Sequence, residues 1–511
     1  MQHSLLTASL LVFLSTLGVR AEGPAAPATN APPSDAKSDA SSKETNAPVI
    51  TDASVVIGGK VVPYRATAGM LPILGKDGKP TAQVFYIAYT QTNRTDAAER
   101  PVTFCFNGGP GSSSVWLHLG AFGPRRVEFA GDGTTPPRPP GRLIPNEFSL
   151  LDTTDLVFID PVSTGYSRPE QPDKAPEFYG QDNDIQTVAE FIRLYTTREK
   201  RWRSPKFLAG ESYGVFRAAG LANYLQNRFN LYLNGLILVS GVIDFETLRG
   251  EGLTDTPFLC FLPALTATAH YHKKLPPDLQ ANFNKAIAES RAFAEGPYAR
   301  ALRLGSELTP AEQKAAVDAL ARLTGLPPSY IQDHRLRVSA SEFRKELLKN
   351  EGKILGRFDS RVVSRDGNAA AAMPEFDPSH VLVSGVFSSA MNSYVREDLK
   401  FEKDLPYEIL TSVQPWNFSR PTGYPSTAGD LEAAMKENPH LRVLVLCAWR
   451  DLACPPDGIR HSLRQLGLPV ELRPNIRIEE YEAGHMLYLN PPDLRKSAED
   501  IKAFIRSAVG N

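Results

Sequence analysis

The strongest constraint on the fold is a series of short apolar segments that alternate with helical patterns along the chain. Each segment has the composition of a buried strand and is bounded by glycine, proline or polar residues. The segments are 102–106, 156–159, 206–210, 236–239 and 442–448, and residues 476–481 also have strand character. Parallel strands need crossover connections, so strands that alternate with helices form a largely parallel sheet with helices packed on it. We therefore predict an α/β fold.

Two segments before residue 102, 54–63 and 82–91, also have strand character. Valine, isoleucine, tyrosine and phenylalanine are frequent in them, which is typical of strands. We predict that these two segments pair in an antiparallel arrangement at the N-terminal end of the sheet.

Residues 251–375 differ in character from the rest of the chain. They hold three segments rich in alanine, glutamate, lysine and leucine, which favour helices. These segments are 279–305, 310–324 and 339–350. We predict a helical cap inserted between two parts of the core, residues 49–250 and 376–511. An insertion at strand ends is well placed to act as a lid.

The N-terminal part of the chain reads as a targeting segment. Residues 5–19 are apolar but fall short of the about 20 residues that a transmembrane helix needs. Small residues at positions 19 and 21 then suit signal peptidase, so we predict a signal peptide over 1–21. Residues 22–48 contain no large apolar side chain, and we predict a disordered linker there. We expect an exported protein, periplasmic or secreted, without stable membrane insertion.

Charge and composition exclude several classes of function. Lysine plus arginine number 56 and aspartate plus glutamate 57, so the chain lacks the cationic excess that nucleic-acid binding needs. Four cysteines in 511 residues do not make a disulfide scaffold. Without an H-E-x-x-H, C-x-x-C or phosphate-binding glycine motif, we predict no metal and no cofactor. The sequence does not indicate an oligomeric state.

The segment Gly210-Glu211-Ser212-Tyr213-Gly214 fits the G-x-S-x-G pattern of a nucleophile elbow. In such an elbow the serine stands on a tight turn between a strand and a helix, and glycines avoid clashes in the bend. Here an apolar segment precedes the pattern and a helical pattern, 215–229, follows it. Ser212 is therefore the candidate nucleophile.

A second glycine-rich segment, Asn107-Gly108-Gly109-Pro110-Gly111, follows the strand predicted over 102–106. Glycine lets backbone N–H groups approach a substrate closely. A loop at this place in the chain supplies half of the oxyanion hole in hydrolases that use the elbow. The alternative interpretation is a plain turn.

Asp451 and His485 complete a possible catalytic set. Each directly follows a predicted strand near the C-terminus. A serine nucleophile needs a base and an orienting carboxylate, and the order serine, aspartate, histidine is the one found with the elbow. Asp457 is a competing carboxylate, but it lies farther from the strand end.

Taken together, the chain resembles a bacterial-type member of the serine carboxypeptidase family in the α/β-hydrolase superfamily. The resemblance rests on segments that occur in the family's order: FNGGPGSSS (106–114), IDPVSTGYS (159–167), GESYG (210–214), WRDLACP (449–455) and AGHM (483–486). It implies an α/β-hydrolase fold with peptides as substrates, and hence a secreted serine protease that acts in proteolysis.

The resemblance also implies roles for individual residues. Ser212 would be the nucleophile, His485 the general base and Asp451 its orienting carboxylate. The backbone N–H groups of Gly109 and Tyr213 would form the oxyanion hole.

Three further residues would act in substrate binding. Asn107 and Glu211 would bind the C-terminal carboxylate of the peptide, and Met486 would lie near the pocket of the leaving residue. Two carboxylates repel unless one carries a proton, so this clamp predicts the best binding at mildly acidic pH.

The chain departs from the family pattern at two positions. It has Ser112 where the family usually has a cysteine, so the disulfide anchored there is missing. It has Ala121 where relatives commonly carry a second glutamate, which weakens the expectation of an acidic optimum.

Three alternatives stay open. An acyltransferase or esterase would use the same triad, and retention of both Asn107 and Glu211 favours a peptidase. A non-catalytic binding protein would show the loss of a triad member, and none is lost. A proline-specific aminopeptidase also uses a Gly-Gly-Pro-Gly loop but usually has tryptophan at the position of Tyr213.

Overall fold

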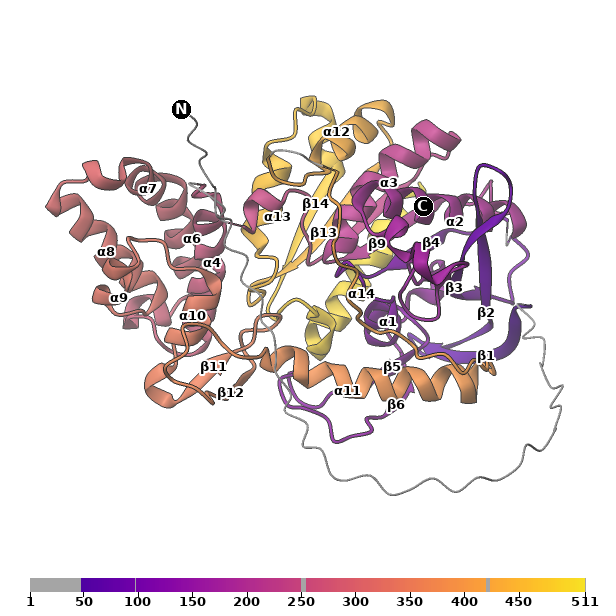
Figure 1. Ribbon diagram of the computed structural model, residues 1–511, viewed down its shortest axis with the longest axis horizontal. Helices are drawn as coiled ribbons and strands as arrows, with labels where there is room; N and C mark the ends of the chain where they lie inside the picture. Colours follow the sequence, from indigo (N-terminus) through magenta and orange to yellow (C-terminus); the bar gives the residue numbers. More distant parts are fainter. Residues whose placement is uncertain (1–46, 97, 250–253, 420–422, 511) are drawn as a thin grey trace, which may run out of the picture. The chain divides into compact units, whose positions relative to one another are not determined.

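The computed structural model describes residues 47–96, 98–249, 254–419 and 423–510, which lie in one compact unit (Figure 1). Within them, ten strands form one sheet in the order β1-β2-β3-β7-β4-β9-β10-β13-β14, with β8 paired to β3. Pairs from β7 to β14 are parallel, whereas β1, β2, β3 and β7 pair antiparallel. The strands are β1 (Val49–Ile57), β2 (Lys60–Leu74), β3 (Pro80–Gln91), β4 (Val102–Phe106), β7 (Asp155–Ile159), β8 (Arg168–Pro169), β9 (Lys206–Glu211), β10 (Gly235–Val239), β13 (Arg442–Ala448) and β14 (Ile476–Tyr481). The predicted α/β fold is confirmed.

Successive residues of the central strands face two separate apolar cores. In β10, Leu236 and Leu238 join one cluster of buried side chains, whereas Ile237 joins the other. Both faces are covered, which is why these strands read as continuous apolar runs. Helices on the first face are α2 (Gln181–Arg198), α3 (Tyr213–Phe229) and α12 (Ala428–Glu437), and those on the second are α11 (Pro378–Ser393) and α14 (Pro491–Ala508).

The prediction of one strand over 54–63 is wrong. Gly58 and Gly59 form a two-residue turn between β1 and β2, and both have positive φ angles, of 54° and 77°. Ser54 and Pro63 face each other across this hairpin. Two consecutive glycines between apolar runs favour such a turn, because its central residues need positive φ. The strand that pairs with β3 is β2.

A helical block follows β10 and has an apolar cluster of its own. Its helices are α4 (Thr256–Tyr271), α5 (Pro277–Gln280), α6 (Phe283–Phe293), α7 (Ala299–Leu304), α8 (Pro310–Thr324), α9 (Pro328–Asp333) and α10 (Ala340–Glu346). The segment 279–305 is divided, because the Asn282 side chain caps a new helix at α6 and a π-helical turn over Ala294–Tyr298 precedes α7. Leu452, in the loop that follows β13, packs into the cluster of the block.

The predicted signal peptide, residues 1–21, and most of the predicted linker lie outside the described residues. None of the helices in the described ranges is long and apolar enough to cross a bilayer.

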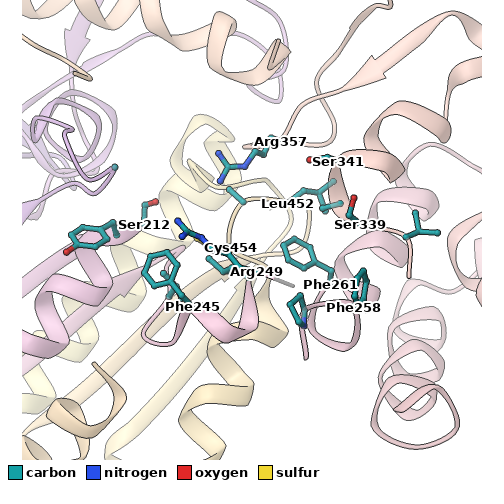
Figure 2. A pocket seen from close by; sticks show the side chains of 18 residues that line it. Ser212, Phe245, Arg249, Phe258, Phe261, Ser339, Ser341, Arg357, Leu452 and Cys454 are labelled. Carbon is teal, nitrogen blue, oxygen red and sulfur yellow. The ribbon is translucent and has the colours of Figure 1, made fainter. Parts of the chain in front are cut away.

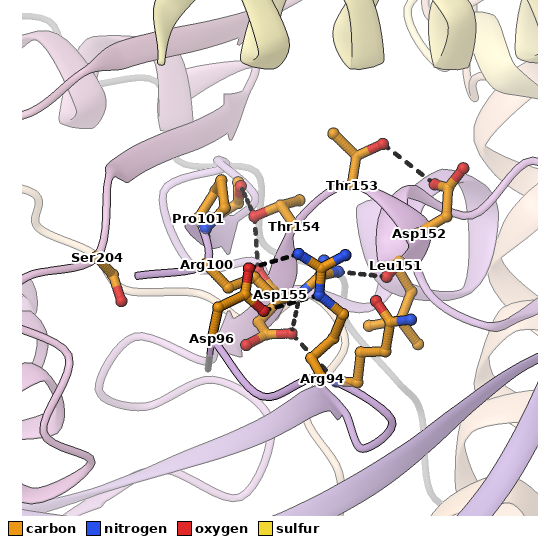
Figure 3. A network of polar contacts seen from close by, with 12 residues as sticks. Arg94, Asp96, Arg100, Pro101, Leu151, Asp152, Thr153, Thr154, Asp155 and Ser204 are labelled. Carbon is orange, nitrogen blue, oxygen red and sulfur yellow. Dashed lines mark hydrogen bonds and ion pairs between the residues drawn. The ribbon is translucent and has the colours of Figure 1, made fainter. Parts of the chain in front are cut away.

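A buried charge network closes the end of the sheet opposite Ser212. Asp155, the first residue of β7, accepts hydrogen bonds from Arg100 (Nε to Oδ1, 2.8 Å) and Arg201 (Nη1 to Oδ2, 2.7 Å). Figure 3 shows Arg100 between Asp155 and the backbone of Leu151. All three charged side chains are buried, so two cations depend on one carboxylate.

We expect Asp155→Asn to lower the free energy of unfolding by about 3–5 kcal/mol, because it leaves two buried guanidinium groups without a charged partner. Urea unfolding followed by circular dichroism measures the change. Asp52→Asn is the matched control, since Asp52 pairs with Arg65 on the exposed surface, and it should leave the midpoint unchanged. Equal midpoints for the two variants would contradict the prediction.

Candidate active site

Ser212 stands on a sharp turn between β9 and α3, at the C-terminal edge of the parallel strands. Its φ of 62° and ψ of −126° are unusual for a residue with a side chain, and such strain costs about 1–3 kcal/mol. Its N–H donates to the Val239 carbonyl at 3.0 Å, which holds the turn to β10. A Cβ atom on Gly210 would lie 2.2 Å from the Gly214 carbonyl oxygen, so both glycines allow the bend.

Asp451 and His485 follow two neighbouring parallel strands, β13 and β14, so their side chains meet at one edge of the sheet. His485 Nδ1 donates to Asp451 Oδ2 at 2.7 Å, and both side chains are buried. Asp451 Oδ1 accepts from the backbone N–H groups of Ala453 (2.7 Å) and Cys454 (2.8 Å). These bonds fix the carboxylate, and it in turn orients the imidazole, so that in the neutral ring Nδ1 carries the proton and Nε2 is free to accept one.

The environment of His485 favours its protonated form. Burial alone would lower the pKa of His485, but the charge and hydrogen bond of Asp451 outweigh burial and raise that pKa above its ordinary value. The ring of Phe358 stacks on the imidazole with 5.1 Å between ring centres. Such an imidazole can take up a proton and hold it beside Asp451.

A short segment, residues 357–360, runs along the loops that carry Asp451 and His485, and we call it the strap. Its Arg357 carbonyl accepts from the Leu452 N–H at 3.0 Å, and its Phe358 carbonyl accepts from the His485 N–H. The Asp359 carboxylate accepts from the Gly484 N–H at 3.2 Å. The strap therefore anchors the loops of Asp451 and His485 through their backbones.

The loop 107–111 lies directly on the N-terminus of α3. A Cβ on Gly108 would lie 2.3 Å from the Tyr213 nitrogen, so only glycine permits this approach. Gly109 has a φ of 103°, which also favours glycine. The loop therefore packs its backbone against the first turn of α3, and Gly109 and Tyr213 line the same cavity as Ser212.

Asn107 is held by hydrogen bonds both to its side chain and to its backbone carbonyl. The Leu117 N–H donates to Asn107 Oδ1 at 3.1 Å, and the Asn107 side chain in turn hydrogen-bonds the Glu211 carboxyl group. Arg217 Nη1 donates to the Asn107 carbonyl at 2.6 Å, and the buried Arg217 is paired with Asp184 at 2.7 Å. Thus α3 positions both Ser212 and Asn107.

Asp160 fixes the far end of the same loop. Its Oδ1 accepts from the N–H (2.8 Å) and the hydroxyl (2.7 Å) of Ser114, and its Oδ2 accepts from the Tyr407 hydroxyl at 2.8 Å. The motif IDPVSTGYS therefore supports the loop and does not itself reach Ser212.

Glu211 is a buried carboxyl group beside Ser212. Burial raises the pKa of Glu211 to about 7, although His485 and hydrogen bonds from Tyr488 and Asn107 oppose the shift. Glu211 is therefore protonated in part of the population at neutral pH, when it can donate a hydrogen bond to an anion.

Tyr488 is a site residue that the sequence analysis missed. Its hydroxyl donates to Glu211 Oε2 at 2.9 Å, and burial followed by the Glu211 charge keeps the pKa of Tyr488 well above its usual value. The ring fits because position 120 is glycine, where a Cβ would lie 2.3 Å from it. A neutral phenol thus accompanies Glu211, while position 121, where relatives commonly carry a second glutamate, holds the buried Ala121.

Two cavities meet at Ser212. The smaller one, about 220 Å³, is lined by Asn107, Glu211, His485 and Met486, and also by Phe358 and His380, which no sequence motif indicated. The larger one, about 340 Å³, extends toward the helical block and is shown in Figure 2. Gly109, Ser212 and Arg357 line both. Ser212 therefore stands between two cavities.

Other residues that the sequence analysis singled out have partners of their own. Asp457, the competing carboxylate, is paired with Arg291 at 2.8 Å. Ser112 accepts from Trp116 Nε1 at 2.8 Å at the position where the family usually has cysteine. The four cysteines are buried and free, and Cys454 lies beside Ser212. Among the described residues, no group of three potential metal ligands occurs.

The comparisons with known proteins give a consistent result. The family model "Serine carboxypeptidase" matches residues 59–477. The chain is 28% identical to the pheromone-processing carboxypeptidase KEX1 of Saccharomyces cerevisiae over 212 residues, which are 37% of this chain and 27% of that protein. It is 27% identical to serine carboxypeptidase-like 36 of Arabidopsis thaliana over 168 residues, which are 31% of this chain and 32% of that protein. The match thus spans about a quarter of the length of the KEX1 protein.

A solved structure supports the fold. The structure of KEX1(delta)p, a prohormone-processing carboxypeptidase from Saccharomyces cerevisiae, has a TM-score of 0.53 and 18% identity to this chain. It covers 87% of this chain and 91% of its own. The two proteins therefore share the α/β-hydrolase fold.

Proposed function

The chain belongs to the serine carboxypeptidase family, and on that basis we propose that it releases the C-terminal amino acid from peptides through Ser212, His485 and Asp451. The observation that carries this proposal is the buried Glu211, which lines one cavity together with Asn107, Ser212 and His485. A general esterase has no need of an acid group buried beside its nucleophile, whereas an exopeptidase must bind a terminal carboxylate there.

In the proposed acylation, Ser212 Oγ attacks the carbonyl carbon of the last peptide bond and its proton passes to His485 Nε2. The C–N bond then breaks, and the same proton moves from His485 to the leaving amine. Asp451 stabilises the imidazolium formed in between, because it accepts from Nδ1 at 2.7 Å. The products are a free amino acid and an ester at Ser212.

In the proposed deacylation, water attacks the ester carbon and gives a proton to His485. The ester C–O bond breaks, and Ser212 Oγ regains its proton from His485 while the shortened peptide leaves as a carboxylic acid. In both steps the carbonyl oxygen becomes negative, and the N–H groups of Gly109 and Tyr213 would donate to it.

The proposed clamp binds the terminal carboxylate with two side chains. Asn107 would donate from Nδ2, and Glu211 would donate from its protonated oxygen. Tyr488 supports this geometry because it donates to Glu211 Oε2 at 2.9 Å, and Asn107 also hydrogen-bonds this carboxyl group, so both residues would orient it toward the substrate. Met486 lines the same cavity and would contact the side chain of the leaving residue.

The helical block contributes to the larger cavity. Phe258 and Phe261 of α4 and Ser341 of α10 line it opposite Ser212. These contacts support the proposal that residues 251–375 form a cap over the acyl side of the site. We also propose that residues 1–21 direct export, so that the substrates are peptides outside the cytoplasm.

Two matched peptides test the proposed function. One ends in a free carboxylate, the other in an amide, and purified protein from residue 49 onward is incubated with each. We expect release of the last amino acid from the free acid at a rate at least about tenfold above the amide, because hydrogen bonds to a charged group contribute about 1.5–3 kcal/mol. Equal rates for the two peptides would contradict the proposed binding of the terminal carboxylate by Asn107 and Glu211. Cleavage of simple esters alone would indicate an esterase or acyltransferase.

The clamp also predicts a specific pH dependence. The ratio of kcat/KM for the free-acid peptide to that for the amide peptide should fall about tenfold per pH unit above 7. The reason is that the pKa of Glu211 is about 7: the protonated form binds the carboxylate, and binding is lost as pH rises through that value. Titration of His485 affects both peptides and cancels in the ratio.

Glu211→Gln provides the control for this pH profile. Its amide donates to a carboxylate at every pH, so the ratio should become independent of pH between 6 and 9. A ratio that still falls above pH 7 in Glu211→Gln would assign the titration to a different group.

A further inference from the structure

The larger cavity combines apolar walls with two arginines near the nucleophile. Arg249 and Arg357 both line it, and Figure 2 shows their side chains between Ser212 and the aromatic side chains of the helical block. Its apolar lining includes Phe245, Leu248, Phe258, Phe261, Val338 and Leu452. Among the described residues that line this cavity, none is acidic. The cavity is therefore positively charged at the end next to Ser212.

Both guanidinium groups are held in place by stacking on aromatic rings. The Arg249 guanidinium carbon lies 4.9 Å from the ring centre of Phe245 and 5.8 Å from that of Phe418. The Arg357 guanidinium carbon lies 5.5 Å from the ring centre of Phe358. Stacking leaves the five N–H donors at the edge of each group available to a ligand.

Neither arginine has an anionic partner within the described part of the chain. The neighbouring arginines Arg337 and Arg344, by contrast, lie within 4 Å of carboxylates, those of Asp255 and Asp377. The Arg357 backbone, by contrast, is fixed: its N–H donates to Asp377 at 2.8 Å and its carbonyl accepts from Leu452. A fixed backbone with an uncommitted guanidinium is the arrangement expected of a residue that receives a ligand.

The orientation of the bound peptide places the residues before the scissile bond in the larger cavity. The proposed clamp binds the terminal carboxylate in the smaller cavity, and Ser212 attacks the preceding carbonyl at the boundary between the two. The residue before the scissile bond therefore enters the larger cavity, where Arg249 and Arg357 lie. This step rests on the proposed function.

We infer that the enzyme prefers peptides whose penultimate residue is acidic, with Arg357 and Arg249 as the residues that determine this specificity. A glutamate side chain places its methylene groups against the apolar wall and its carboxylate among guanidinium donors. A lysine at the same position would face two like charges. Such repulsion excludes competing substrates as effectively as attraction selects the preferred one.

The test uses three peptides, acetyl-Ala-X-Phe with a free carboxylate, in which X is glutamate, glutamine or lysine. At pH 7 and low salt we expect kcat/KM for glutamate to exceed that for glutamine at least about fivefold, and that for lysine by at least about 25-fold. Raising the salt concentration to 1 M should shrink both ratios, because salt screens partly exposed charges. Phenylalanine release measures all three rates.

Two variants assign the preference to the arginines. In Arg357→Gln and in the double variant with Arg249→Gln, the glutamate-to-glutamine ratio should fall toward one. Arg138→Gln is the matched control, because Arg138 is exposed and lies outside both cavities, and it should leave the ratio unchanged. Since the readout is a ratio, a general loss of active enzyme does not affect it.

The outcomes separate this inference from the proposed function. Release of phenylalanine from all three peptides at equal rates would overturn the acidic preference and leave the carboxypeptidase intact. Equal loss on all three peptides in Arg357→Gln would also overturn it and would assign Arg357 to the terminal carboxylate. Failure to release phenylalanine even from the glutamine peptide would instead refute the proposed function, on which the preference rests.

Discussion

Ser212→Ala should lower kcat for peptide hydrolysis by about 10⁴- to 10⁶-fold, which is the loss seen when a triad nucleophile is removed. The alanine keeps the Cβ atom and the same backbone strain, so unfolding in urea should show an unchanged midpoint. Ser54→Ala on the exposed strand β1 is a matched control that should retain full activity. Residual activity within tenfold of the original would exclude Ser212 as the nucleophile.

Covalent chemistry gives a second readout of the same variant. The original protein mixed with a chromogenic ester should release a burst of one equivalent of alcohol, and acid quenching should trap a protein whose mass is raised by the acyl group. Ser212→Ala should show neither. A mass increase that persists in the variant would place the acyl group on a different side chain.

Asp451→Asn should lower kcat by about 10⁴-fold while KM changes little, because asparagine cannot hold His485 in the tautomer with Nδ1 protonated. The structure supports this expectation: the carboxylate accepts from His485 at 2.7 Å and from two backbone N–H groups. The effect should be non-additive, so that Asp451→Asn combined with Ser212→Ala is no slower than Ser212→Ala alone.

Asp457→Asn is the discriminating control for the orienting carboxylate. The sequence allowed Asp457 as a competitor, and the structure pairs it with Arg291. Its replacement should leave the tautomer of His485 untouched and reduce kcat far less than Asp451→Asn, with urea unfolding recorded for both variants. A larger loss in Asp457→Asn would reverse the assignment.

The parallel core could be predicted because β4, β7, β9, β10 and β13 are buried on both faces and read as apolar runs. Residues 102–106, 442–448 and 476–481 coincide with β4, β13 and β14. The hairpin at Gly58 and Gly59 was missed because the apolar residues on either side read as one continuous strand. Only the glycine pair marked the turn.

The residues near Ser212 also fall into two groups, those that the sequence could indicate and those that it could not. Ser212, Asp451, His485 and Glu211 follow strand ends or belong to short motifs, so order and spacing could indicate them. Arg357 and Phe358 reach the site from the end of the helical block, far along the chain, and Tyr488 reaches Glu211 through space that Gly120 leaves open. Such neighbours depend on tertiary packing, which a local pattern does not encode.

The strap constrains how the helical block could be exchanged between related proteins by recombination. By sequence character the block extends to residue 375, yet the carbonyls that receive the amides of Leu452 and His485 belong to residues 357 and 358. In a chimera joined at residue 375, the strap would come from the other protein, whereas the loops of Asp451 and His485 that it contacts would come from this one. A breakpoint placed before residue 357 would keep those loops with their native partners. The segment that must be kept together with the sheet core therefore includes the strap.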